Sequence, residues 1–311
     1  YFDPSKLRCA LVTCGGLCPG LNDIIRSVVL ELYHGYGVRH IYGIKYGLQG
    51  FIPAYGHDIM DLTGGTVTNI LDMGGSILGS SRGPQPVDEI VDTLERLSIG
   101  LLFMIGGDGT LKAASAIADA ITVKKLKIGV VGIPKTIDND IEETDQTFGF
   151  DTAVAIAVEA IDRIHTTAQS HHRVMIVEVM GRQCGFLALM GALASGSEKA
   201  YLPEIGISLA ELNQDVEILK TSFACGKRMV IYLRNEHSSR HYTTDFIRRL
   251  MEEESKGQFE VRTAILGHVQ RGGSPTAFDR LLASRMGAFA AKTLFQALQG
   301  QEFEVQVLGL R

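Results

Sequence analysis

The sequence predicts an α/β protein in which helices cover both faces of mainly parallel sheets. Short apolar runs alternate along the 311 residues with longer stretches of helical periodicity, which is typical of parallel strands joined by helices. Two of these apolar runs end in glycines and aspartates, at the position where open α/β sheets carry their functional groups. Together the two observations favour a doubly wound architecture.

The individual elements follow from this alternation in chain order. Each predicted strand is a short apolar run, and these runs lie at 7–14, 41–44, 101–105, 127–133, 174–179, 229–233 and 263–266. Between them, apolar residues recur at helical spacing over 21–32, 111–121, 152–170, 209–223, 243–254 and 276–298. No repeat, low-complexity tract or Pro/Ser-rich linker marks a domain boundary.

Composition narrows the class of protein. A hydrophobic content of 45% and a mean hydropathy of +0.12 allow a sizeable core. The net charge of -5, without a Lys/Arg cluster, argues against a nucleic-acid partner. We expect no membrane partner either, because there is no signal peptide and no apolar run of the roughly 18 residues that a span needs. The five cysteines lack zinc-site spacing, so we expect a reducing, cytoplasmic setting.

Two carboxylate motifs follow predicted strands. Asp138 and Asp140 lie in the run 134–140, which directly follows strand 127–133, and Asp108 lies in the run Gly-Gly-Asp-Gly-Thr that follows strand 101–105. Glycine lets the backbone approach an anion, and carboxylate oxygens are ligands that suit Mg²⁺. These strand ends therefore predict a site for Mg²⁺ and phosphate.

Two glycine-rich segments add weaker signals. Segment 15–22 follows the first strand and opens a helix, so its amides can hold phosphate oxygens. Its spacing fits neither a P-loop nor G-x-G-x-x-G, however, and a structural turn explains it equally well. Segment 74–83 includes Arg82, a cation suited to phosphate, although a lone arginine is more often a surface residue.

Four motifs, taken in order, carry a resemblance to a known family. Gly-Gly-Asp-Gly-Thr alone implies phosphoryl transfer, but it also occurs in kinases that phosphorylate NAD and lipids. The chain continues with Pro-Lys-Thr-Ile-Asp-Asn-Asp at 134–140, Met-Gly-Arg at 180–182, and Gly-His-Val-Gln-Arg-Gly-Gly-Ser-Pro at 267–275. This set resembles the 6-phosphofructokinase family, and the resemblance runs from residue 15 to about residue 298.

The resemblance implies the fold and the assembly. It implies two Rossmann-like, doubly wound domains with the active site in the cleft between them. We expect residues 1–149, completed by 270–311, to bind the phosphate donor, and residues 150–269 to bind fructose 6-phosphate. An allosteric homo-oligomer is also implied, either a dimer or a homotetramer, with active sites shared between subunits.

The implied activity is the glycolytic transfer of a phosphoryl group from ATP to the 1-hydroxyl of fructose 6-phosphate, with Mg²⁺ as cofactor. Asp138 is the implied base, and Asp108 and Asp140 bind or orient the metal. Such transfer depends mostly on positioning and electrostatics. The residues implied to stabilise the transferring group are Thr136, Arg82 and Arg182, and those implied to bind the nucleotide are Gly15, Gly16, Arg82, Gly107, Asp108, Gly109 and Thr110.

The resemblance also implies a sugar-phosphate site. Its residues are Thr136, Asp138, Met180, Gly181, Arg182, Glu236, His268 and Arg271, with Arg173 and Arg262 reaching in from a neighbouring subunit. Taken singly, Met180 is equally a strand-end hydrophobe, Glu236 a solvated carboxylate and His268 a core histidine. Their position within the family motifs favours the functional interpretation.

Two positions help to predict whether the phosphoryl donor is ATP or pyrophosphate. Gly109 is typical of ATP users in the family, because pyrophosphate users carry a second Asp there. Lys135 is typical of pyrophosphate users, although some ATP users in plants and trypanosomatids combine both residues. We therefore expect ATP, with a pyrophosphate-dependent enzyme as the alternative. A third alternative is a non-catalytic regulatory subunit that senses sugar phosphate, and it would be expected to have lost Asp138, Asp108 or Arg182.

The allosteric site of bacterial members is matched in part. Arg26, Glu204 and Lys227 fit the pattern, whereas His165 and Cys225 stand where those enzymes have Arg and Lys. With fewer permanent cations, we expect weaker binding of anionic effectors.

Overall fold

The chain forms two compact units in a computed structural model that describes residues 3–300 and 306–307. Unit 1 comprises Tyr1–Thr136, Ile141–Gly149 and Arg271–Arg311, and unit 2 comprises Ile137–Asp140 and Phe150–Gln270. Within the predicted donor-binding segments 1–149 and 270–311, positions 1–2, 301–305 and 308–311 lie outside the described residues.

Unit 1 is built on a six-stranded sheet with the order β10-β5-β4-β1-β2-β3. All neighbouring strands are parallel except β2 and β3. β4 and β5 are buried along their whole length, as expected for strands covered on both faces. The strands span Arg8–Thr13 (β1), His40–Ile44 (β2), Ile59–Asp61 (β3), Leu101–Gly106 (β4), Gly129–Pro134 (β5) and Gln306–Val307 (β10).

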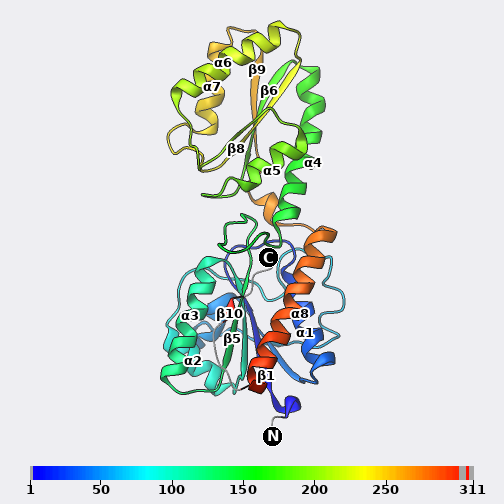
Figure 1. The fold of residues 1–311 in the computed structure, drawn as a ribbon, viewed down its shortest axis with the longest axis vertical. Coiled ribbons are helices and arrows are strands. Elements are labelled where there is room, and N and C mark those ends of the chain that lie inside the picture. Colours follow the sequence, from blue (N-terminus) through cyan, green and yellow to red (C-terminus); the bar gives the residue numbers. More distant parts are fainter. Residues whose placement is uncertain (1–2, 301–305, 308–311) are drawn as a thin grey trace. The chain divides into compact units, whose positions relative to one another are not determined.

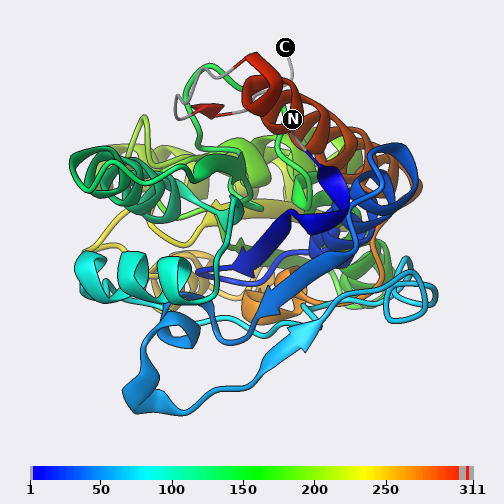
Figure 2. The same ribbon diagram turned by 90° about the horizontal axis from the view of Figure 1, so that it is seen from below.

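Helices cover both faces of this sheet. Figures 1 and 2 show α2 and α3 on one face and α1 and α8 on the other. The α-helices span Leu21–Leu30 (α1), Val87–Arg96 (α2), Asp108–Val123 (α3) and Ala277–Gly300 (α8). A π-helix at Glu31–Gly35 extends α1, and short 3₁₀ turns lie at Pro4–Lys6, Gly47–Phe51, Pro53–Tyr55 and Gly267–Arg271.

The order of the unit 1 strands fixes where a ligand can bind. β1 lies between β2 and β4, so the chain proceeds to one side of β1 through β2 and to the other side through β4 and β5. Doubly wound sheets bind ligands outside the carboxyl ends of the strands at such a reversal. The carboxyl ends of β1 and β4 are therefore the expected location of a site in unit 1.

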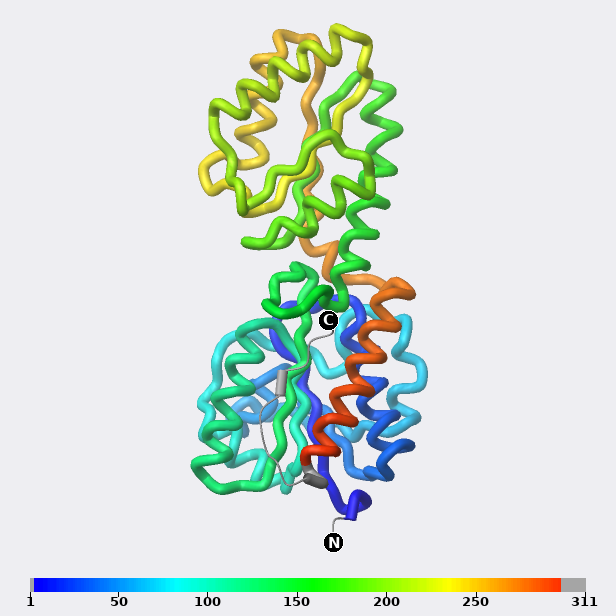
Figure 3. Tube along the Cα trace, viewed as in Figure 1, coloured from blue at the N-terminus to red at the C-terminus, as the bar shows by residue number. Residues whose placement is uncertain are grey.

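Unit 2 is a smaller doubly wound unit with an all-parallel sheet, β7-β8-β6-β9. In Figures 1 and 3, α4 and α5 lie on one face of the sheet and α6 and α7 on the other. The strands span Arg173–Val179 (β6), Lys199–Tyr201 (β7), Met229–Asn235 (β8) and Glu260–Ile265 (β9), and the helices span Phe150–Ser170 (α4), Phe186–Ser195 (α5), Leu209–Ala224 (α6) and Thr244–Glu254 (α7).

The predicted fold class is confirmed, and the errors concern particular elements. The prediction missed α2, α5, β3, β7 and β10. The two three-residue strands are too short to show an alternation. In α5, apolar residues occupy almost every position, so no helical period is visible. The start of β9 was placed at 263, but the strand begins at Glu260, where exposed polar residues interrupt the apolar run.

Two further properties concern the described part of the chain. None of its helices is long and apolar enough to cross a membrane. All five cysteines are free thiols: Cys9, Cys14 and Cys18 are buried, Cys184 is half-buried and Cys225 is exposed. Burial raises the pKa of the Cys14 thiol to about 12, so that thiol is not a nucleophile at neutral pH.

Candidate active site

The predicted site residues are divided between the two units. Unit 1 holds Gly15, Gly16, Arg82, Gly107, Asp108, Gly109, Thr110, Lys135, Thr136 and Arg271. Unit 2 holds Asp138, Asp140, Arg173, Met180, Gly181, Arg182, Glu236, Arg262 and His268.

In unit 1, the turn after β1 is fixed to the segment that carries Arg82. Gly15 has φ +82°, a conformation that favours glycine. Its N–H donates to Ser81 O at 3.0 Å, and the Ser80 hydroxyl donates to Gly15 O at 2.6 Å. The two glycine-rich segments of the sequence are thus joined into one structure.

Three cationic side chains converge on Gly16. A Cβ atom at this position would lie 2.9 Å from Arg271 Nη1 and 3.5 Å from Arg82 Nη2. The Lys135 ammonium donates to Gly16 O, and Arg271 Nη1 donates to Leu17 O at 3.4 Å. Cations beside glycine amides at the end of a strand form an anion-binding environment.

The contacts of Arg271 and Lys135 add to what their motifs alone suggested. Arg271 was predicted to bind the sugar phosphate, and the structure places it in unit 1 against the turn after β1. Lys135 was considered only for donor selectivity, yet it is 3% exposed and hydrogen-bonded to that same turn. No sequence pattern signals either contact, because both join segments far apart in the chain.

The turn after β4 leads directly into the N-terminus of a helix. α3 begins at Asp108, and the N–H of Thr110 donates to Gly107 O at 2.8 Å. The positive end of the helix dipole and its free amides favour an anion here. A Cβ atom at Gly109 would meet no atom within 4 Å, so this position faces open space.

The next strand end completes the unit 1 group. Lys135 N–H donates to Gly106 O at 2.9 Å, which continues the pairing of β5 with β4. Thr136 follows and is buried, and its carbonyl accepts a 2.7 Å hydrogen bond from the Thr147 hydroxyl. The carboxyl ends of β1, β4 and β5 thus bring together glycine amides, three cations and Asp108.

The carboxylates of this site suit an Mg²⁺ ion that is bound mainly by substrate phosphates. Asp108 carries an exposed carboxylate that pairs with Lys112 Nζ at 2.8 Å. Within residues 3–300 and 306–307, no group of three His, Cys, Asp or Glu side chains is arranged to hold a metal ion. Mg²⁺ needs only one or two protein carboxylates when substrate phosphates complete its shell. Asp108 beside the glycine amides suits that arrangement, and Asp140 is an exposed carboxylate in unit 2.

In unit 2, a buried carboxylate faces an arginine. Asp138 is 3% exposed, and its Oδ2 lies 3.8 Å from Arg182 Nε. Arg182 has φ +50° and follows Gly181 at φ +127°, so this turn is left-handed at two successive residues. A Cβ atom at Gly181 would lie 2.6 Å from Asn235 Nδ2, so only glycine fits there.

Hydrogen bonds from neighbouring strands hold this turn. Met180 N–H donates to Gln270 Oε1 at 2.9 Å, and Arg182 N–H donates to Glu236 Oε1 at 3.1 Å. Asn235 Nδ2 donates to Cys184 O at 2.9 Å. Asn235 and Gln270 are both fully buried, and the sequence prediction missed them as site residues. Gln270 lies inside a recognised motif, which was the one signal available.

Three other predicted residues of unit 2 have different surroundings. His268 is exposed on the 3₁₀ turn after β9. Arg173 begins β6, and its Nε lies 2.8 Å from Glu260 Oε2. Arg262, on β9, lies 3.3 Å from the same Glu260 oxygen and 3.2 Å from Glu252 Oε1. A strand rises about 3.3 Å per residue, so Arg173 is roughly 20 Å from the other end of β6.

A buried acid lies where α1 leaves the turn after β1. Asp23 is 1% exposed, and neither carboxylate oxygen has a hydrogen-bond partner. Burial raises the pKa of Asp23 to about 7, while Arg280 and Arg26 act in the opposite direction and Asp279 adds a smaller increase. This carboxyl therefore changes its charge near neutral pH.

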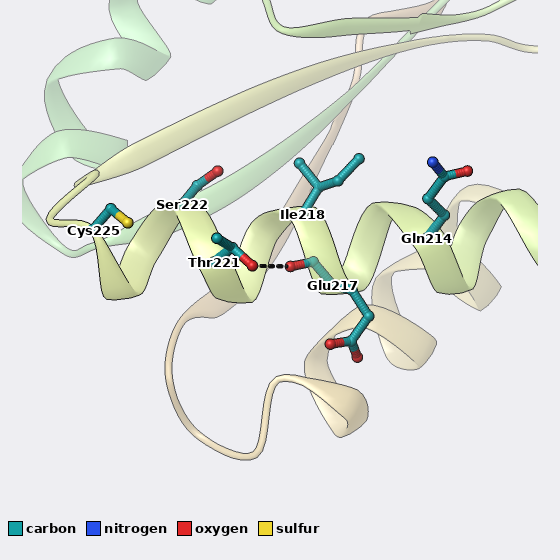
Figure 4. A pocket seen from close by; sticks show the side chains of 6 residues that line it. All are labelled: Gln214, Glu217, Ile218, Thr221, Ser222 and Cys225. Atoms are coloured by element: carbon teal, nitrogen blue, oxygen red, sulfur yellow. Dashed lines mark hydrogen bonds between the residues drawn. The ribbon is translucent and has the colours of Figure 1, made fainter.

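A surface pocket on α6 does not belong to these groups. It has a volume of about 470 Å³ and is lined by Gln214, Glu217, Ile218, Thr221, Ser222 and Cys225, which all come from one helix and its end (Figure 4). Thr221 donates to the backbone carbonyl of Glu217 at 2.9 Å. The lining contains one carboxylate and no cation, so it is unsuited to phosphate.

Comparison with known proteins identifies the family. The family model described as phosphofructokinase matches residues 8–294. The chain belongs to the phosphofructokinase family. That match includes all four motifs and the residues of both groups described above.

Similar phosphofructokinases come from different groups of organisms. The chain is 40% identical to ATP-dependent 6-phosphofructokinase 3 of Streptomyces coelicolor, over 96% of this chain and 93% of that protein. It is 44% identical to an ATP-dependent 6-phosphofructokinase of Trypanoplasma borreli, over 74% of this chain and 47% of that protein. The solved phosphofructokinase of Saccharomyces cerevisiae superposes with a TM-score of 0.89 at 31% identity. That superposition covers 96% of this chain but only 41% of the yeast chain.

Proposed function

We propose that this chain is an ATP-dependent 6-phosphofructokinase. It transfers the γ-phosphoryl group of ATP to the 1-hydroxyl of fructose 6-phosphate and forms fructose 1,6-bisphosphate, ADP and a proton, a step of glycolysis. The observation that carries this proposal is the buried Asp138 carboxylate with Arg182 Nε at 3.8 Å. Relatives named as ATP-dependent 6-phosphofructokinases support the same activity.

On the acceptor side, Asp138 takes the proton from the 1-hydroxyl as the oxygen attacks the phosphorus. The nearby Arg182 guanidinium favours the ionised carboxylate, which is the form that can accept a proton. Arg182 also offers positive charge to the transferring phosphoryl group. Met180, Gly181 and Glu236 shape the sugar site, because hydrogen bonds tie this turn to its neighbours.

On the donor side, the groups at the ends of β1, β4 and β5 hold the nucleotide phosphates. Arg82, Lys135 and the amides of the Gly15 turn attract the phosphate oxygens, and the N-terminus of α3 adds its dipole. When bound, Mg²⁺ neutralises phosphate charge, and Asp108 would hold it. Thr136 offers its hydroxyl to the same phosphate oxygens. Catalysis of this kind rests on positioning and electrostatic stabilisation.

The position of two arginines supports an active site shared between subunits. Arg173 and Arg262 are both paired with Glu260, and Arg173 is roughly 20 Å from the carboxyl end of its own strand. They are thus poorly placed for the sugar site of their own chain. We propose that they bind the 6-phosphate of fructose 6-phosphate in a neighbouring copy, within a cytoplasmic homo-oligomer, a dimer or a tetramer. Phosphate would then compete with Glu260 for both guanidinium groups.

A pyrophosphate-dependent enzyme is the second candidate. The observation that favours it is Lys135, a cation that is 3% exposed and fixed against Gly16. The open space at Gly109 favours ATP, because it leaves room for a nucleotide at the start of α3. A regulatory subunit is disfavoured, since Asp138, Asp108 and Arg182 are all retained.

A steady-state assay tests these proposals directly. The purified protein is incubated with fructose 6-phosphate and either MgATP or Mg-pyrophosphate, and formation of fructose 1,6-bisphosphate is measured. We expect turnover with ATP and much slower turnover with pyrophosphate. A protein that prefers pyrophosphate contradicts the donor assignment. A protein that uses neither donor contradicts the proposed activity.

A further inference from the structure

Arg234 is a buried cation inside β8 to which neither the sequence motifs nor the proposed reaction assigns a role. Its side chain is 2% exposed, and arginine is almost never this buried unless it is paired. Nη1 donates to Glu178 Oε2 at 2.7 Å, from the residue directly opposite on β6. The Thr244 hydroxyl, at the start of α7, donates to the same Glu178 oxygen.

The two Nη atoms of the guanidinium bind the loop that follows β8. Nη1 also donates to Glu236 O at 3.3 Å. Nη2 donates to Ser239 O at 2.9 Å and to Tyr242 O at 3.2 Å. One side chain therefore holds the beginning, middle and end of loop 236–242, which lies between β8 and the residue that caps α7. The planar fork of donors in arginine makes this possible, because its geometry is fixed before binding.

The loop held in this way carries Glu236 to the predicted sugar site. Glu236 Oε1 accepts the 3.1 Å hydrogen bond from Arg182 N–H, and Glu236 N–H donates to Val179 O at 2.9 Å. Arg182 in turn faces Asp138 at 3.8 Å. Each step from Arg234 to the proposed base is a contact within unit 2.

We infer that Arg234 is a positioning residue for fructose 6-phosphate. It fixes loop 236–242 so that Glu236 and the turn 180–182 are set in place before the sugar binds. The inference rests on the proposed function, and it concerns a residue too buried to touch the substrate itself. Preorganisation of this kind increases affinity because less ordering remains to be done on binding.

A purely structural role would have a different signature. Removing Arg234 alone leaves the Glu178 carboxylate without its cation, and an uncompensated charge destabilises the fold. Two variants restore the charge balance without restoring the loop contacts. Arg234→Lys keeps a cation near Glu178, but one nitrogen cannot reach that carboxylate and three carbonyls together. The double variant Glu178→Gln/Arg234→Met removes both charges.

The experiment compares the wild-type protein with these two variants. We measure kcat, the KM for fructose 6-phosphate, the KM for ATP, the thermal midpoint, and amide hydrogen exchange over 236–243. We expect near-normal midpoints, faster exchange in the loop, and a KM for fructose 6-phosphate raised about tenfold, the effect of about 1.4 kcal/mol. The KM for ATP should stay within about twofold. Arg163→Lys, at an exposed ion pair on α4, is the matched control.

Each outcome decides the inference. Variants of normal stability whose KM for fructose 6-phosphate is unchanged refute a positioning role, and so does a loop whose exchange is unchanged. If the KM for fructose 6-phosphate rises only in the variant whose thermal midpoint falls, and by an amount that follows that fall, Arg234 has a role in stability only. Wild-type protein that fails to phosphorylate fructose 6-phosphate overturns the proposed function, and the role of Arg234 in sugar binding falls with it. That failure is recognised in the wild-type measurement before any variant is compared.

Discussion

Replacing Asp23 by asparagine is expected to change how stability depends on pH. Asp23 is 1% exposed, and burial raises its pKa from 3.8 to about 7. Between these two values the folded protein holds a proton that the unfolded chain has released. Stability therefore falls as pH rises through this window, and the loss is complete above about pH 7. Asparagine has nearly the same shape and does not ionise, so the variant should lack this loss.

The expected magnitude follows from the size of the shift. One pKa unit corresponds to about 1.36 kcal/mol, so a shift of about three units costs the wild-type protein about 4 kcal/mol at pH 8. At pH 5 the same group costs less than about 2 kcal/mol, because the folded carboxyl is still protonated. The stability difference between Asp23→Asn and wild type should thus grow by about 2 to 3 kcal/mol from pH 5 to pH 8.

Urea unfolding followed by circular dichroism at a series of pH values measures this difference. Asp119→Asn, at an exposed carboxylate on α3, is the control and should give a flat difference profile. The charged groups facing Asp23 are Arg26, Arg280 and Asp279, and they are unchanged in both proteins. Parallel pH profiles for wild type and Asp23→Asn would show that the Asp23 carboxyl does not titrate near neutral pH, and would refute the reasoning.

Three further predictions concern the proposed reaction. Asp138→Asn should bind fructose 6-phosphate normally but lower kcat by roughly 10²-fold or more, as loss of a general base does, and a near-normal kcat would exclude that role. Gly109→Asp should impair ATP use far more than pyrophosphate use, because the added carboxylate fits the open space but repels the nucleotide phosphates. Mixing Arg262→Ala with Asp138→Ala under conditions of subunit exchange should recover activity well above either parent. No recovery despite verified exchange would count against shared sites.

Matched variants separate the effect of charge from that of side-chain size or shape at Gly109 and Arg262. Gly109→Asn has the size of Gly109→Asp without its charge, so it should lose less ATP turnover than Gly109→Asp, and the loss that remains measures the effect of the filled space. Arg262→Lys keeps a cation near Glu260 and Glu252, so its KM for fructose 6-phosphate should lie between those of wild type and Arg262→Ala. Equal losses for aspartate and asparagine at position 109 would mean that space, rather than charge, selects the donor.

Elements with a strong local pattern were predictable. β4 and β5 are buried at every position, so their sequences read as unbroken apolar runs. The glycines before Asp108 and the short polar run that contains Asp138 come after these strands, so both carboxylates were predicted to lie near strand ends. β9 was misplaced because Glu260 and Arg262 pair with each other on an exposed face, and a sequence shows only their polarity.

Contacts made by buried polar residues could not be predicted. Asn235, at the end of β8, and Gln270, in the turn after β9, hold the turn that follows β6. Gln270 lies inside a motif, but the motif does not show which backbone group its side chain binds, and nothing in the neighbours of Asn235 marks its contact. The motif that contains Arg271 gave no sign of its contact with Gly16, which is far away in sequence. Long-range pairings of this kind are decided by topology, and local pattern carries no information about them.

The way the chain is divided between the units has a consequence for biosynthesis. Unit 1 is completed by segment 271–311, in which α8 packs against α1 and covers β5 closely enough that a Cβ atom at Gly129 would lie 2.9 Å from Leu294. On the ribosome, β1, β4 and β5 emerge long before this helix is made. α1 is made early and lies on the same face, but the part of that face that α8 covers stays uncovered while all of unit 2 is synthesised, and unit 2 has every strand of its sheet by Ile265. The smaller unit can fold first, and the apolar surface of unit 1 that α8 covers is open to aggregation until that helix appears.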